Sequence, residues 1–212
     1  EDADQLGVIG TGKQSVPQVA AVHAVRPLRR VRYFGRDAAR RESFEKRLRE
    51  QGFTFELVAA ESAAEAVAGA PIVTLISRAK EPFLEAAMLE PGAHVNAMGA
   101  IARDREEFAQ NLFPRVSAMA ADRPETVRQL SKEFVSWAET DETRWDRLEP
   151  LSRVVAGARS RGDDWDLTLF KSMGMGLSDL AVGAEALRRA RAAGLGRPID
   201  AIKKSAPRLR RS

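Results

Sequence analysis

The chain has 212 residues, of which 44% are hydrophobic and 30% are charged, and its formal net charge is +4. This length and composition are typical of one soluble domain with a sizeable core, or of one domain with a small appendage. They exclude a membrane span, because no apolar run approaches the roughly 18 residues required, and they exclude disulfides and cysteine chemistry, because cysteine is absent.

The distribution of charge indicates a solvated surface. Positive charge is spread over segments such as 36–49, where it is mixed with glutamate, and only the tail 203–211 is a basic cluster. We therefore expect no nucleic-acid partner and no membrane partner. The lack of cysteine and of a basic-then-apolar leader favours a cytoplasmic protein. Because the chain starts at Glu1 rather than Met, just before the first predicted strand, we expect a piece of a longer protein or a processed form.

The first half of the chain alternates strands with helices. Strands are predicted at 6–10, 31–34, 53–59, 72–76 and 93–98. Helices are predicted at 15–25, from 38 to the glycine at 52, and at 62–68. This alternation predicts an α/β fold of the Rossmann type, with a doubly wound, mostly parallel sheet and helices on both faces.

Local signals mark the ends of these helices. Asp37 is placed to cap the helix that carries Phe44 and Leu48 at i, i+4 on its inner face, and Gly52 is a typical stop after it. The segment 62–65 reads Ser-Ala-Ala-Glu, which is a capping box.

The second half is less regular. Its predicted elements are helices at 104–112, 125–137 and 177–193, strands at 116–120 and 165–170, and a polar stretch at 139–149. We therefore predict a Rossmann-type domain over 1–176, followed by a C-terminal helix and basic tail over 177–212.

A glycine-rich turn, Gly10-Thr11-Gly12, separates the first strand from the first helix. Gly10 permits a tight turn, Gly12 lets a pyrophosphate approach the backbone, and the helix N-terminus favours the anion. The third glycine of the usual pattern is replaced by Ser15, which is still small. The turn predicts a dinucleotide phosphate site and so makes 1–176 a dinucleotide-binding domain. The alternative is a merely tight turn.

The tip of the second strand reads Gly35-Arg36-Asp37, without an acid at the position that binds a free ribose 2′-hydroxyl. Arg36 supplies a planar cation suited to a 2′-phosphate, and Arg40 and Arg41 follow one helical turn later. This pattern favours NADP over NAD. In the alternative, Arg36 is a solvated surface residue and Asp37 binds the ribose.

With these features in place, the chain resembles the ornithine cyclodeaminase/mu-crystallin family from about residue 6 to about residue 196. The resemblance is carried, in this order, by GTGKQ at 10–14, SAAEAV at 62–67, EPFL at 81–84, PGAHVNAMG at 91–99, REEF at 105–108 and FKSMGMGLSDL at 170–180.

The resemblance implies a Rossmann domain joined to a separate substrate-binding and dimerisation domain, in a homodimer. Its members cyclise ornithine with loss of ammonia, reduce cyclic imino acids, dehydrogenate amino acids, or bind ligands without turnover. The resemblance implies an NAD(P)-dependent oxidoreductase acting at the α-carbon of a small amino or imino acid. The alternatives are an ornithine cyclodeaminase-like ammonia lyase and a non-catalytic NADP-binding protein.

The resemblance and the residue patterns together give a set of cofactor contacts. The pyrophosphate and ribose contacts are Gly10, Thr11, Gly12, Lys13, Gln14, Gly35, Arg36 and Asp37. The contacts near the nicotinamide are Ser77 after the fourth strand, the loop with Asn96, Met98 and Gly99, and a second wall with Ser172 and Met173.

Two departures from the family pattern concern the chemistry. Ile101 stands where cyclodeaminases carry an aspartate that exchanges a proton with the substrate amine, which argues against cyclodeamination. The family's substrate-gripping arginine and catalytic lysine come from a region that this sequence lacks. The catalytic residues are therefore unknown; Asp179 is a weak candidate, since an acid in a helix's first turn is usually structural. We predict packing roles for His23 and His94, and no metal site.

Overall fold

The structure is a computed structural model that describes residues 3–157, 161–162, 164–197 and 199. The chain forms two compact units, Glu1–Gly174 and Met175–Ser212. The described strands all belong to the first unit, and the second contains the helix α7 (Gly176–Ala192).

The first unit is built on an eight-stranded sheet in the order β3-β2-β1-β4-β5-β8-β6-β7. The strands are β1 (Gln5–Ile9), β2 (Arg30–Phe34), β3 (Glu56–Ala59), β4 (Ile72–Leu75), β5 (His94–Ala97), β6 (Val116–Ala121), β7 (Leu148–Pro150) and β8 (Leu167–Lys171). Every neighbouring pair is parallel, which confirms the predicted Rossmann-type fold.

Short connections and helices join the strands. The α-helices of this unit are α1 (Ser15–Val25), α2 (Ala38–Glu50), α3 (Ala63–Val67), α4 (Pro124–Leu130), α5 (Lys132–Ala138) and α6 (Leu151–Val155). The 3₁₀ helices are η1 (Ala86–Met88), η2 (Gln110–Arg115) and η3 (Glu142–Arg147).

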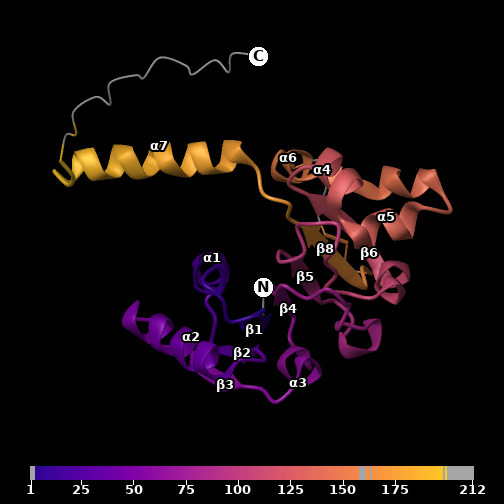
Figure 1. The fold of residues 1–212 in the computed structure, drawn as a ribbon, viewed down its shortest axis with the longest axis horizontal. Helices are drawn as coiled ribbons and strands as arrows, with labels where there is room; N and C mark the ends of the chain where they lie inside the picture. The colour runs from indigo at the N-terminus through magenta and orange to yellow at the C-terminus, as the bar shows by residue number, and fades with distance from the viewer. Residues whose placement is uncertain (1–2, 158–160, 163, 198, 200–212) are drawn as a thin grey trace, which may run out of the picture. The chain divides into compact units, whose positions relative to one another are not determined.

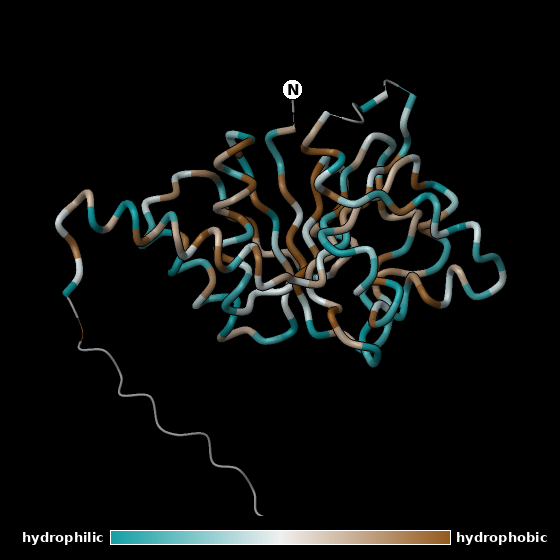
Figure 2. The backbone as a smooth tube through the Cα atoms, turned by 90° about the horizontal axis from the view of Figure 1, so that it is seen from above, coloured by the Kyte–Doolittle hydropathy of each residue, from teal (hydrophilic) through white to brown (hydrophobic). Residues whose placement is uncertain are grey.

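Two hydrophobic clusters occupy the two faces of the sheet. Successive side chains of a strand point to opposite faces, so Leu6 and Val8 of β1 pack with Phe44 of α2, whereas Ile9 joins Val67 of α3 in the second cluster. Figure 1 shows α1 and α2 on one side of the first three strands and α3 on the other. Figure 2 shows the hydrophobic strands side by side in the middle of the unit, with hydrophilic segments outside them.

The strand order determines where a ligand can bind. The chain runs outward from β1 through β2 to β3, and then returns to place β4 on the other side of β1. Because connections leave β1 and β4 in opposite directions, their carboxyl ends lie at a switch point of the strand order, which is where open α/β sheets bind ligands. A second return places β8 between β5 and β6, so the carboxyl ends of β4, β5 and β8 are neighbours.

Several predicted segments differ from the structure. The helix predicted over 104–112 is wrong for 104–109, where the N–H groups of Phe83 and Leu84 donate to the Glu107 carbonyl at 3.2 and 3.1 Å; only 110–112 are helical, as the start of η2. The helix predicted over 125–137 is interrupted at Ser131, where the backbone is extended (φ −82°, ψ 107°). The strand predicted over 53–59 begins only at Glu56. The polar stretch contains η3 and β7, which its composition did not indicate.

Two searches of the described residues bear on the function classes. None of their helices combines the length and the apolarity that crossing a bilayer requires. Within the same residues, no group of three or more His, Asp or Glu side chains is placed to hold a metal ion.

Candidate functional site

The glycine turn lies at the carboxyl end of β1, at this switch point. Gly10 has φ 114°, and a Cβ there would lie 2.4 Å from the Ile76 carbonyl oxygen. The Gly10 N–H donates to the Phe34 carbonyl at 2.8 Å, which ties the turn to β2. A Cβ at Gly12, by contrast, would meet no described atom within 4 Å. Gly10 therefore serves the fold, whereas Gly12 leaves an open approach to the backbone.

Two side chains brace the carbonyl oxygens of this turn. The fully buried Ser15, at the start of α1, donates from Oγ to the Gly12 carbonyl at 2.7 Å. Arg47 of α2 donates from Nη2 to the carbonyls of Gly12 and Thr11, at 3.1 and 3.4 Å. These hydrogen bonds hold the carbonyl groups of the turn in place. The turn leads into the N-terminus of α1, where helix N–H groups favour an anion. Lys13 and Gln14 are exposed at this helix start.

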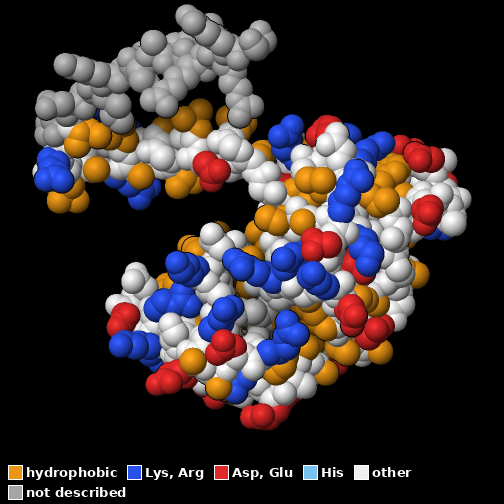
Figure 3. Space-filling model, in the orientation of Figure 1, with side chains coloured by type: hydrophobic (Ala, Val, Ile, Leu, Met, Phe, Trp, Pro, Cys, Tyr) orange, Lys and Arg blue, Asp and Glu red, His pale blue; other side chains and the backbone are white. Residues whose placement is uncertain are grey.

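The tip of β2 touches the glycine turn. A Cβ at Gly35 would lie 2.5 Å from Thr11 Oγ1, and the Gly35 carbonyl accepts a hydrogen bond from Arg41 Nη1 at 2.6 Å. Asp37 caps α2 by accepting the Arg40 N–H at 3.1 Å, as predicted. Arg36 is exposed beside them. Figure 3 shows Lys and Arg side chains gathered over the part of this unit that carries α1 and α2.

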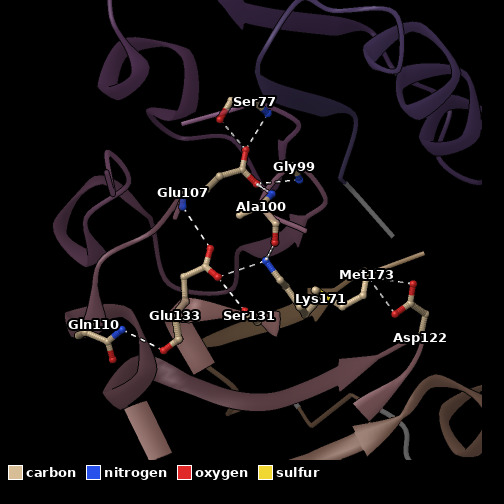
Figure 4. Close-up of polar contacts among 10 residues, drawn as sticks. All are labelled: Ser77, Gly99, Ala100, Glu107, Gln110, Asp122, Ser131, Glu133, Lys171 and Met173. Carbon is tan, nitrogen blue, oxygen red and sulfur yellow. Dashed lines mark hydrogen bonds and ion pairs between the residues drawn. The ribbon is translucent and has the colours of Figure 1, made fainter. Parts of the chain in front are cut away.

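The loops after β4 and β5 meet at one buried carboxylate. Glu107 Oε1 accepts hydrogen bonds from Ser77 N and Oγ, both at 2.7 Å, and Oε2 accepts the N–H groups of Gly99 at 2.8 Å and Ala100 at 3.0 Å. Figure 4 shows the carboxylate between the two loops. Burial raises the pKa of the Glu107 carboxyl, while the hydrogen bonds from Ser77 and Gly99 and the charge of Lys171 oppose that shift.

A buried ion pair continues this network toward β8. Lys171, at the end of β8, and Glu133, in the first turn of α5, are fully buried with Nζ and Oε2 3.3 Å apart. Lys171 Nζ also donates to the Ala100 carbonyl at 2.8 Å, and the Glu107 N–H donates to Glu133 Oε1 at 3.1 Å. Ser131 Oγ donates to Glu133 Oε2 at 2.7 Å. These bonds join three strand ends and one helix into one polar cluster (Figure 4).

A second carboxylate holds the loop after β8. Asp122, directly after β6, accepts Ser172 Oγ at 2.7 Å, the Met173 N–H at 3.0 Å and the Gly174 N–H at 2.8 Å. Figure 4 shows Asp122 beside the Met173 backbone. Ser172 and Met173, predicted as one wall of the nicotinamide site, are thus fixed through their backbone and hydroxyl groups.

Asn96 lies within β5 and not in the loop after it. Its side chain contacts His94 Nε2 at 3.1 Å and Thr74 Oγ1 at 3.4 Å, while His94 Nδ1 contacts Thr168 Oγ1 at 2.8 Å. Burial lowers the pKa of His94, an effect that the hydrogen bond with Asn96 opposes. His94 thus lies within a row of polar side chains on the sheet.

The remaining candidates divide between the two units. Met98 is half-buried after β5, and its N–H donates to the Leu75 carbonyl at 2.8 Å, so it lies near the Ser77 and Gly99 loops. Ile101 follows with 51% of its surface exposed. Asp179 belongs to α7 in the second unit.

Sequence reasoning missed the residues that hold these loops. They are Arg47, Glu107, Asp122, Glu133 and Lys171. Four of the five are far in sequence from the loops they hold, so no spacing marks them. Glu107 lies only seven and eight positions after Ala100 and Gly99, but no motif marks it as their partner. Two of them could have been noticed, because Glu107 and Lys171 lie inside the REEF and FKSMG segments that carry the family resemblance.

Comparison with known proteins places this site in one family. A family model described as "Ornithine cyclodeaminase/mu-crystallin family" matches residues 1–192. An uncharacterized cyclodeaminase of Sinorhizobium fredii is 32% identical over 192 residues, covering 90% of this chain and 57% of that protein. The chain thus spans about three fifths of the length of this relative.

Solved structures show the same arrangement. The Δ1-pyrroline-2-carboxylate reductase of Thermococcus litoralis, in complex with NADH and L-proline, superposes with a TM-score of 0.84 at 25% identity, covering 93% of this chain and 61% of that one. The iminosuccinate reductase of Paracoccus denitrificans, in complex with NAD⁺, superposes with a TM-score of 0.78 at 25% identity, covering 92% and 59%.

Proposed function

The chain belongs to the ornithine cyclodeaminase/mu-crystallin family, and from this premise we propose that it is the cofactor-binding part of an NAD(P)-dependent oxidoreductase. The substrate is a small amino acid or a cyclic imino acid, and the reaction takes place at its α-carbon. Two reductases of imino acids with the same fold, both solved with NADH or NAD⁺, support this proposal.

The observation that carries the proposal is the pair of glycines at the end of β1. The backbone at Gly10 requires glycine for the fold, but the space beside Gly12 is open, with no described atom within 4 Å of a Cβ there. An open backbone at the N-terminus of α1, at the switch point of a parallel sheet, is where a pyrophosphate binds. The residues present therefore fit a nicotinamide dinucleotide.

We propose NADP as the preferred cofactor. Arg36 is exposed at the tip of β2, and Arg41 lies close by with its guanidinium on the Gly35 carbonyl. The Asp37 carboxylate is engaged as the cap of α2 and lies 3.3 Å from Arg40 Nε, which makes it a weaker ribose ligand. The tip of β2 therefore offers arginine side chains, while its carboxylate already caps a helix. Such a site suits a 2′-phosphate better than the two free hydroxyl groups of a ribose.

In this proposal the residues of this chain bind the cofactor and orient it. When bound, a nicotinamide dinucleotide supplies or accepts a hydride. The glycine turn holds its phosphates, and the loops with Ser77, Met98, Gly99 and Met173 hold the nicotinamide end on the β4 side of the switch point. Ile101 carries no proton donor or acceptor, which favours a reductase or dehydrogenase over a lyase.

Cyclodeamination is the second candidate, because the Sinorhizobium fredii relative is named a cyclodeaminase. It requires a proton-transferring group that replaces the missing aspartate at position 101. The two candidates differ in their products: a reductase consumes NADPH in proportion to its product, whereas a cyclodeaminase releases ammonia without net change of the cofactor.

The test is an assay of the complete gene product with Δ1-pyrroline-2-carboxylate and NADPH, followed by absorbance at the NADPH band. The expected result is stoichiometric oxidation of NADPH and formation of the cyclic amino acid. Ammonia release from ornithine with no net NADPH oxidation would favour the second candidate. No change of NADPH or NADP⁺ with any cyclic imino acid or small amino acid would contradict the proposal.

A further inference from the structure

We propose that Glu107 is a positioning residue for the nicotinamide end of the cofactor, an inference that rests on the proposed function. It holds the loops after β4 and β5 in one arrangement, and the buried pair of Glu133 and Lys171 connects that arrangement to the end of β8. The cluster of Glu107, Glu133 and Lys171 is called the buried triad below.

The contacts of Glu107 join two separate loops. Its two oxygens divide their bonds, Oε1 to Ser77 and Oε2 to Gly99 and Ala100, so each loop is held by one oxygen of the same carboxylate. The loops also touch directly: a Cβ at Gly99 would lie 2.3 Å from the Ser77 carbonyl oxygen. A shift of either loop therefore breaks hydrogen bonds to a fully buried charge, which is costly.

The triad joins these loops to the third strand end. Lys171 donates to the Ala100 carbonyl while it pairs with Glu133, and Glu133 in turn accepts the Glu107 N–H. All three side chains are fully buried. They meet the ends of β4, β5 and β8, the strands on the β4 side of the switch point. They do not contact the glycine turn or the tip of β2 through any hydrogen bond of the described residues.

The chemistry of the triad favours a geometric role over a purely stabilising one. Burying three ionised groups costs several kcal/mol per ion before their attraction is counted, and apolar residues of the same size often replace such groups without loss of stability. The hydrogen bonds of a carboxylate, however, fix the direction of each backbone N–H that it accepts. A stack of hydrophobic side chains cannot fix two loop backbones in this way.

This role makes a selective prediction. The adenosine and phosphate end of the cofactor is assigned to the β1 and β2 tips, and the nicotinamide end to the β4, β5 and β8 tips. A defect in the triad should weaken binding of the complete dinucleotide and leave binding of its adenosine half unchanged. A general loss of folding weakens both ligands together.

The experiment compares Glu107→Gln with the wild-type 212-residue chain. Glutamine keeps the size of the side chain but replaces one acceptor oxygen by an NH₂ group, which then faces two N–H or O–H donors. NADPH and NADH binding is measured by fluorescence titration, and binding of ADP-ribose and 2′-phospho-ADP-ribose by calorimetry. Glu106→Gln is the matched control, because the neighbouring Glu106 pairs with the exposed Lys132 and not with the triad.

We expect Glu107→Gln to weaken binding of the dinucleotide about tenfold or more, with the adenosine fragment and the control variant unchanged. Equal weakening of both ligands, or no weakening, would overturn the inference. The proposed function itself fails if the wild-type chain binds neither ligand, or if it binds both ligands weakly and with the same affinity.

A milder variant covers the case in which Glu107→Gln does not fold. Ser131→Ala removes the 2.7 Å hydrogen bond to Glu133 at the far end of the triad and leaves Glu107 intact. We expect this variant to bind the dinucleotide about threefold more weakly and the fragment as tightly as the wild type. The effect is smaller because the lost hydrogen bond acts on Glu107 only through Glu133. Weakening of the fragment by the same factor would contradict the positioning role.

Discussion

The two halves of the sheet's carboxyl edge are fixed by different means. At the tips of β1 and β2 the backbone itself makes the site, through Gly10, Gly12 and Gly35. At the tips of β4, β5 and β8 the loops are held by carboxylates, chiefly the fully buried Glu107 and the partly buried Asp122. Under the proposed function, the open backbone at Gly12 suits a phosphate group, and the fixed loops on the other side suit a ring that must present one face.

The largest expected effect comes from breaking the ion pair on the carboxylate side. Lys171→Met leaves the Glu133 carboxylate buried and unpaired, which should lower the free energy of unfolding by about 3–5 kcal/mol. Urea unfolding followed by circular dichroism measures the change.

The matched control is Lys132→Met, since Lys132 pairs with Glu106 and keeps 45% of its side chain exposed. A surface pair contributes at most about 1 kcal/mol. If the two variants lose equal stability, the buried pair is not what holds this half together.

The next effect tests the glycine side through its cationic tip. Arg36→Ala should weaken NADPH binding by about 1.5–3 kcal/mol, the value of a hydrogen bond to a charged group, and leave NADH binding nearly unchanged. Fluorescence titration with both cofactors gives the two dissociation constants. Tighter binding of NADH than of NADPH by the wild-type chain would contradict the assignment of Arg36.

Two glycines of the same turn separate fold from binding. Gly10→Ala should lower the free energy of unfolding by about 1–3 kcal/mol, because an alanine there is strained and meets the Ile76 carbonyl. Gly12→Ala should change it by less than about 0.5 kcal/mol, yet weaken NADPH binding about tenfold by blocking the phosphates. Thermal unfolding and titration of both variants test this. The account of the turn is wrong if Gly12→Ala binds NADPH like the wild type.

How much of this could be predicted from the sequence differs between the two halves. The alternation of strands and helices, and the constraint that a tight turn places on Gly10, leave local patterns in the sequence. The fold and the glycine turn after β1 were therefore predictable. Glu107 and Lys171 are 64 positions apart in the numbering and are joined only by the sheet order. The helix predicted over 104–112 was wrong for the same reason, because pairing with Leu84 overrides local helical spacing.

The smallest expected effect concerns the row of polar side chains on the sheet. Burial holds the pKa of His94 below its ordinary value of 6.5, so the unfolded chain binds a proton at a pH at which the folded chain does not. Stability is therefore lost as the pH falls below about 6.5. His94→Gln keeps hydrogen-bonding groups without a titrating proton, so its stability should fall less over this range. Thermal unfolding from pH 7.5 to 5 compares the two, and parallel curves would rule out His94 as the cause.

The division of this edge into two halves is tested most directly by amide NMR spectra of the ¹⁵N-labelled chain, recorded with 2′-phospho-ADP-ribose and then with NADPH. The account predicts that the fragment shifts the signal of Gly12 but not that of Gly99, and that NADPH shifts both. Shifts of Gly99 by the fragment as large as those by NADPH, or no shift of Gly12 by either ligand at saturation, would contradict it.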